Sequence, residues 1–168
     1  MHSDSIDPCE YSGANLAGAD FRGADLRDVD FRGSDLTDAD FLGAVLVDVD
    51  FRGSDLTGAN FRDAILTRCR FTGSTLTDAD LRDADLTGVG VNWRSHELVA
   101  EILRRHAGDD MAKRMLAGLI LISKDWCWSQ FAQISHPQRQ WAIDALASHL
   151  REDDAGPGPD FLRKYRTR

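Results

Sequence analysis

The sequence lacks the features of membrane and disulfide-rich proteins. It has three Cys in 168 residues and begins Met1-His2-Ser3-Asp4, without the basic and apolar regions of a signal peptide. No apolar run approaches the roughly 18 residues that a membrane span needs. A disulfide framework is therefore not expected. We predict a soluble, cytoplasmic protein that makes no membrane contact.

Motifs for catalysis are also missing. The sequence has neither the GxxxxGK[ST] loop that cradles phosphates nor the HExxH pair that binds zinc. None of the five His has a Cys or a second His at a tight metal-binding spacing. Cys127 lies between two Trp and is expected to be a buried, inert thiol, the alternative being a nucleophile paired with His136. We predict no enzyme activity, no catalytic, cofactor-binding or metal-binding residue, and no cofactor.

Charge is distributed unevenly along the chain, whose formal net charge is −8. Residues 11–92 contain 15 Asp and 8 Arg but no Glu and no Lys. Residues 93–168 contain 10 acidic and 12 basic residues, together with all four Trp. This contrast indicates two modules with different surfaces.

A five-residue repeat dominates the first module. A large apolar residue occupies every fifth position from Leu16 to Val91, and a small residue usually stands two positions before it. A period of five fits neither a helix, a strand nor a coiled coil. The chain must therefore turn every five residues and send one large and one small side chain inward each time. A solenoid with four repeats per coil satisfies both conditions.

The segment ANLAGADFRGADLRDVDFRGSDLTDADF, residues 14–41, resembles the pentapeptide-repeat family, whose pattern is A(D/N)LXX. The resemblance implies a β-solenoid, a right-handed quadrilateral β-helix, over residues 1–92. About four coils are expected, with an N-terminal cap at residues 1–13. Ile6, Cys9 and Tyr11 keep the phase of the repeat, so the pattern can begin earlier.

Residues twenty apart should lie above one another if four repeats make one coil, with coils about 4.8 Å apart. Sorting by twenty predicts two Leu columns and two Phe columns. The Phe columns are Phe21, Phe41, Phe61 with Leu81, and Phe31, Phe51, Phe71 with Val91. On the walls that carry the Phe columns, Asp stands two residues before Arg, and the charges should partly cancel in the pairs Asp20–Arg22, Asp30–Arg32, Asp50–Arg52 and Asp80–Arg82.

Two other surfaces are candidates for binding. The first, called here the acidic wall, has no Arg and carries Asp35, Asp38, Asp55 and Asp78. The second, called here the apolar patch, places Leu42, Val45, Val47 and Ile65 where most repeats are polar. An exposed apolar cluster usually marks a contact surface. Its occupant is the chain's own C-terminal segment, a second copy or another protein.

The pattern after Val91 becomes helical. About four helices are expected in an α-helical domain at residues 93–151: Ser95 to about Ala107, Asp109 or Asp110 to about Ser123, a short helix from Asp125, and Ser135 to about Arg151. The second helix is expected to bury Met111, Met115, Leu116, Leu119 and Ile120. Residues 152–168 are expected to form a flexible basic tail in which Arg163, Lys164, Arg166 and Arg168 can reach a partner.

Two functions from different classes fit these features. The first is a non-catalytic protein-interaction or structural module that presents an acidic rod-like surface to a protein partner. The second is implied by the resemblance, since some pentapeptide-repeat proteins mimic duplex DNA and bind DNA gyrase or another type II topoisomerase. The Asp–Arg pairs dilute the field that such mimicry needs. Direct nucleic-acid binding is disfavoured because the repeats are acidic, and a homodimer remains open.

Overall fold

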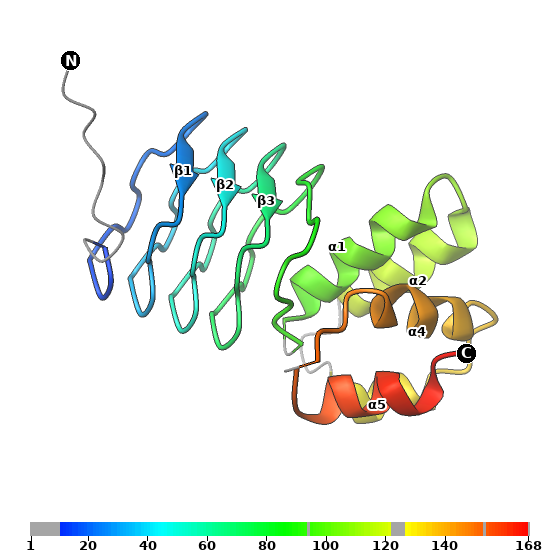
Figure 1. Cartoon of the computed structure of the whole chain (residues 1–168). Helices are drawn as coiled ribbons and strands as arrows, with labels where there is room; N and C mark the ends of the chain where they lie inside the picture. The colour runs from blue at the N-terminus through cyan, green and yellow to red at the C-terminus, as the bar shows by residue number, and fades with distance from the viewer. Residues whose placement is uncertain (1–10, 94, 122–126, 153, 168) are drawn as a thin grey trace, which may run out of the picture. The chain divides into compact units, whose positions relative to one another are not determined.

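The computed structural model of the chain describes residues 11–93, 95–121, 127–152 and 154–167. The chain divides into two compact units, Met1–Gly90 and Val91–Arg168. The first unit is a β-solenoid and the second is built of helices (Figure 1). Among the described residues, no helix is both long and apolar enough to cross a membrane.

Three short parallel strands form one wall of the solenoid: β1 (Asp25–Arg27), β2 (Val45–Val47) and β3 (Ile65–Thr67). The sheet order is β1-β2-β3, and Leu26 pairs with Leu46, which pairs with Leu66. Isolated bridges elsewhere keep the same offset of twenty, from Asn15–Asp35 to Arg70–Gly90. Successive coils therefore lie side by side (Figure 1). The expected coil of four pentapeptides is confirmed.

A tight turn follows most of the large apolar residues of the repeat. In such a turn, the carbonyl of the large residue accepts a hydrogen bond from the N–H of the small residue three positions later. Ala19 donates to Leu16 (3.0 Å) and Ala39 donates to Leu36 (3.0 Å) in this way. The second residue of the turn is left-handed, with φ of 68° at Gly18 and 56° at Asp38. Gly adopts this conformation freely and Asp tolerates it better than most residues. The turn therefore explains why Gly and Asp recur at this position of the repeat.

The solenoid core contains the two expected Phe ladders. In one ladder, Phe41 stacks on Phe21 and on Phe61, each at 4.8 Å between ring centroids. In the other, Phe51 stacks on Phe31 at 5.4 Å and on Phe71 at 5.1 Å. The ladders meet edge to face, which suits the ring quadrupoles and fills the interior. The predicted stacking of residues twenty apart is thus confirmed.

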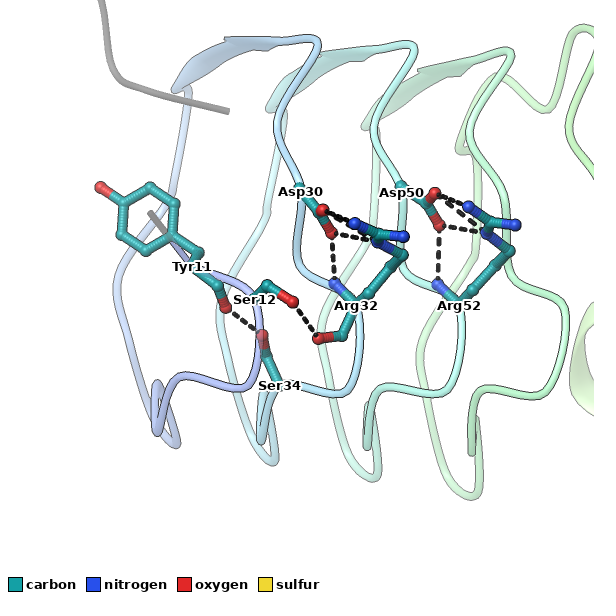
Figure 2. A network of polar contacts seen from close by, with 7 residues as sticks. All are labelled: Tyr11, Ser12, Asp30, Arg32, Ser34, Asp50 and Arg52. Atoms are coloured by element: carbon teal, nitrogen blue, oxygen red, sulfur yellow. Dashed lines mark hydrogen bonds and ion pairs between the residues drawn. The ribbon is translucent and has the colours of Figure 1, made fainter. Parts of the chain in front are cut away.

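The first described coil continues one of these ladders. The Tyr11 ring lies 5.3 Å from that of Phe31, so Tyr11 keeps the phase of the repeat as expected. The Ser34 hydroxyl donates to the Tyr11 carbonyl, and the Ser12 hydroxyl donates to the Arg32 carbonyl (3.2 Å; Figure 2). Ile6, Cys9 and most of the expected N-terminal cap lie outside the described residues.

The second unit contains helices α1 (His96–Ala107), α2 (Met111–Leu121), α3 (Trp128–Gln133), α4 (Arg139–Ala147) and α5 (Pro157–Tyr165). As expected, Ser95 caps α1, and its hydroxyl accepts the Leu98 N–H (3.2 Å). Helix α1 packs against α2 and α4, and α5 packs against α3 and α4. Helix α3 begins at Trp128, and Asp125, the predicted start of the third helix, lies outside the described residues. The predicted fourth helix was too long at both ends.

The expectation of a flexible C-terminal tail is wrong for residues 157–165, which form α5. Pro157 opens the helix, where its fixed φ is favourable and its missing N–H is not needed. Leu162 is fully buried, and the Phe161 ring lies 5.8 Å from that of Phe131 and 5.9 Å from that of Trp128. These apolar contacts order a segment whose Gly and Pro content is typical of a linker.

The expected burial along α2 is also partly wrong. Leu116 and Ile120 are buried, but Met111, Met115 and Leu119 are exposed. Met115 and Leu119 each stand one residue before a buried position, which is about 100° around an α-helix. The contact with α1 therefore covers one face of α2 and leaves the neighbouring apolar face open.

Candidate interaction surface

Strand β2 carries the centre of the apolar patch. Val45 and Val47 flank the buried Leu46 and are half-buried themselves. Val45 pairs with Ile65 of β3, whose side chain is 40% exposed. Leu42 is 38% exposed and lies in the turn that leads into β2. The structure therefore places Val45, Val47 and Ile65 on two adjoining strands of one wall, with Leu42 three residues before Val45.

Polar residues border the patch along the solenoid. The column through Val45 and Ile65 has Asp25 before it and Asp85 after it. Asp25 forms an ion pair with Arg27 at 2.8 Å. An apolar area with a polar rim is typical of a protein contact surface.

The acidic wall consists of exposed carboxylates. The backbones of Asp35 and Asp55 form a β-bridge between successive coils, which places the two residues side by side. Asp38 and Asp78 occupy left-handed turn positions. None of the four carboxylates forms an ion pair within the described part of the chain. Hydrogen bonds from the side chain and backbone of Thr37 lower the pKa of Asp35. The wall therefore presents negative charge without internal compensation.

The Phe walls are different because their Asp and Arg residues pair, as expected. Asp30 accepts the backbone N–H of Arg32 at 2.9 Å and binds its guanidinium through both carboxylate oxygens (Figure 2). Asp50 and Arg52 repeat this geometry one coil later. The bonds from Arg32 lower the pKa of Asp30. Burial raises the pKa of Asp50, but the hydrogen bonds from Arg52 outweigh burial, so the pKa of Asp50 is lowered as well. The pairs at Asp20 and Asp80 complete the set.

The solenoid carries a charged groove of about 450 Å³ that pairs within one repeat do not predict. Arg68 reaches across one coil to Asp48, and Arg70 stands where preceding coils have Asp30 and Asp50. The sequence signal was Arg70 itself, a base at a position that is usually Asp or Asn. The residues lining the groove are Asp28, Val29, Asp30, Arg32, Asp48, Asp50, Arg52, Arg68 and Arg70.

The helical unit holds a cavity of about 530 Å³ between Trp93, Trp128 and the start of α5. Cys127 lines it and is exposed, so the expectation of a buried thiol is wrong. The residue precedes α3, where its Sγ lies 2.8 Å from the Ser129 hydroxyl, and this bond lowers the pKa of the thiol. The Nδ1 atom of His136 accepts the Gln138 N–H at 3.1 Å. The side-chain partner of Cys127 is Ser129, and no hydrogen bond joins Cys127 to His136 among the described residues.

The basic residues of the C-terminal segment have structural contacts. Arg163 donates to the carbonyls of Arg151 (3.0 Å) and Asp154 (2.7 Å), which ties α5 to the preceding loop. The Lys164 ammonium lies 5.0 Å from the centre of the Tyr165 ring. Arg166 follows the last turn of α5, and Arg168 lies outside the described residues. The expected basic binding segment is therefore at least partly a helix.

Comparison with known proteins identifies the repeats. The family model described as a pentapeptide repeat region matches residues 5–92, which is more than half of the chain. The chain belongs to the pentapeptide-repeat family. No curated protein matches this pentapeptide-repeat chain.

Several solved structures resemble the chain. HetL from the cyanobacterium Nostoc, involved in heterocyst differentiation regulation, is 36% identical over 48% of this chain and 38% of its own, with a TM-score of 0.47. Rfr23 from the cyanobacterium Cyanothece is 28% identical over 45% of this chain and 52% of its own, with a TM-score of 0.44. QnrB1, a plasmid-mediated fluoroquinolone resistance protein, is 30% identical over 47% of this chain and 42% of its own, with a TM-score of 0.31. The chain thus spans about half or less of each of these pentapeptide-repeat proteins.

Proposed function

We propose that this pentapeptide-repeat chain is a non-catalytic interaction module that binds a protein partner in the cytoplasm. A right-handed, four-sided solenoid would hold the binding surface rigid, because each coil is fixed by hydrogen bonds to the next. The observation that carries the proposal is the apolar patch. Val45, Val47 and Ile65 occupy outward positions of β2 and β3. In the column through Val45 and Ile65, the flanking coils have Asp25 and Asp85 instead.

Core packing does not account for the apolar residues at these positions. Leu46 and Leu66 already fill the interior between them and are fully buried. Burying a Val or Ile side chain contributes about 1.5–3 kcal/mol, so covering a half-exposed trio contributes on the order of 2–4 kcal/mol to binding. The acidic wall adds a complementary role, since unpaired carboxylates speed the approach of a basic partner.

The test compares affinity capture by the intact chain and by the variant Val45→Thr/Val47→Thr/Ile65→Thr. Thr keeps the β-branched shape and already occupies position 67 in the same wall. We expect the variant to retain the solenoid, seen by circular dichroism, and to lose its specific partner by at least tenfold in quantitative mass spectrometry.

The matched control is Asp35→Asn/Asp55→Asn, which alters the acidic wall and leaves the apolar patch intact. This variant should still capture the partner, with an association rate that depends less on ionic strength. Capture of the same proteins in equal amounts by the Thr variant and the unaltered chain would contradict the proposal.

A further inference from the structure

Helix α2 exposes an apolar stripe that belongs neither to the apolar patch nor to the acidic wall. Met111 is 70% exposed, Met115 is 61% exposed and Leu119 is 50% exposed. The small residues Ala112 and Gly118 are exposed beside them. These five residues are called here the α2 stripe. The neighbouring face of the helix, with Leu116 and Ile120, is buried.

The composition of the stripe is unusual for a surface helix. Solvent-facing positions of such a helix normally carry charged or polar residues. Here the stripe holds no polar side chain over two turns, and its large members follow one another at four-residue spacing. Lys113 pairs with Asp110 at 3.3 Å, and Arg114 pairs with Asp109 at 3.2 Å. The charges nearest the stripe are therefore neutralised locally and do not oppose the approach of a second apolar surface.

The stripe is symmetric about its central residue. Met111 and Leu119 lie four residues on either side of Met115, and Ala112 and Gly118 lie three residues on either side. In a twofold interface, residue i contacts residue j, and j contacts i. Two antiparallel copies of α2 would therefore place Met111 against Leu119 twice and Met115 against itself at the axis.

The sizes of the side chains agree with this pairing. Large residues meet large ones, while Ala112 meets Gly118, which has open space around its Cα. Small residues at facing positions allow two helix axes to approach to about 8 Å. Binding to a helix of unrelated sequence would not require the large and small residues to be placed symmetrically about Met115. The symmetry therefore favours a second copy of α2 as the partner.

We propose that the α2 stripe is the interface of a homodimer in which two α2 helices pack antiparallel across Met115. The exposed apolar area of the stripe is of the order of a few hundred Å² per copy, below the roughly 800 Å² per partner of a standard stable interface. The dimer is therefore weak and reversible, with a dissociation constant in the micromolar range. The stripe and the apolar patch lie in different units, so failure of this proposal leaves the proposed function untouched.

Sedimentation velocity on the full chain between about 1 and 200 µM tests the association. We expect the unaltered chain to shift from monomer to dimer over this range. Met115→Glu brings two carboxylates together at the axis and should weaken the dimer at least tenfold. Because Met115 is exposed in one copy, the helical circular dichroism should not change.

Leu121→Glu is the matched control. Leu121 is 49% exposed on the same helix but lies about 200° around the helix from Leu119, outside the stripe. This variant should dimerise like the unaltered chain. A chain that stays monomeric at 200 µM, or equal weakening by the two Glu variants, would overturn the proposal.

Cysteine cross-linking tests the antiparallel register. In a Cys9→Ser/Cys127→Ser background, Met115→Cys should form a disulfide dimer under mild oxidation, since its Cβ atoms face each other at the axis. Met111→Cys should cross-link poorly to itself and efficiently when mixed with Leu119→Cys. Efficient self-linking of Met111→Cys would indicate a parallel pair and overturn the proposed geometry.

Discussion

At the scale of single residues, Gly158 shows how a distant contact fixes a residue type. A Cβ at this position would lie 2.4 Å from two atoms of the Trp128 indole. Trp128 cannot move freely because it is buried and its Nε1–H donates to the Trp93 carbonyl at 2.7 Å. The close approach of α5 to this ring therefore requires glycine.

We predict that Gly158→Ala lowers the free energy of unfolding of the helical unit by about 1–3 kcal/mol, because overpacking forces side chains or backbone to shift. Chemical denaturation followed by circular dichroism at 222 nm measures the change. The clash should be smaller in a Trp128→Phe background, so the two substitutions should be non-additive. Equal effects of Gly158→Ala in both backgrounds would contradict the role given to Trp128.

Residues in the solenoid were more predictable than Gly158. The pairing of Asp with the Arg two residues later was expected, and Asp30, Asp50 and Asp80 also accept the backbone N–H of that Arg. This contact spans two residues and recurs with the repeat, so the sequence alone indicates it. Gly158 meets a side chain thirty residues away, and no local pattern reports such a contact.

At the scale of elements, His149 follows α4 and links it to α1. Its ring lies 5.2 Å from that of His106, whose Nδ1 is 2.9 Å from the Ile102 carbonyl. Burial, together with the nearby His106, lowers the pKa of His149 below 6.5. The folded state therefore binds fewer protons here than the unfolded state does just below pH 6.5. Stability from neutral His149 is present above pH 6.5 and is lost as pH falls toward the lowered pKa.

We predict that the urea concentration at the midpoint of unfolding, followed by the helical signal, decreases as the pH is lowered from 7 to 5. The substitution His149→Gln should make this decrease smaller. Gln is polar and of similar size but does not titrate in this range. Urea titrations at pH 5, 6 and 7 compare the two chains. Identical pH dependence in both would show that His149 does not report the contact between α1 and α4.

The helices were less predictable from the sequence than the solenoid. The ladders of Phe41 and Phe51 could be predicted because coils of four repeats place residues twenty apart above one another. The apolar pattern of α2 was read correctly as a helix, but it did not show which apolar face α1 would cover. Helix α5 was missed because its Gly and Pro residues suggested a linker, while the contacts that order it come from α3 and α4.

At the scale of the whole molecule, DNA mimicry depends on the density of unpaired negative charge. The four unpaired carboxylates of the acidic wall lie on three successive coils, which span roughly 15 Å at about 4.8 Å per coil. Duplex DNA of that length carries about nine charges. Asn15 and Thr75 make the column through Asp35 and Asp55 neutral at its two ends. The wall therefore has less than half the charge density of the duplex.

We predict that the chain does not inhibit DNA supercoiling by gyrase at about 10 µM in a standard gel assay. The reason is local pairing, since Arg22, Arg32, Arg52 and Arg82 cancel carboxylates that would otherwise extend the negative surface. Replacing these four Arg by Gln raises the net negative charge by four, and any inhibition should appear first in that variant. Inhibition by the unaltered chain that disappears in Asp35→Asn/Asp55→Asn would instead show that one acidic wall is sufficient for mimicry.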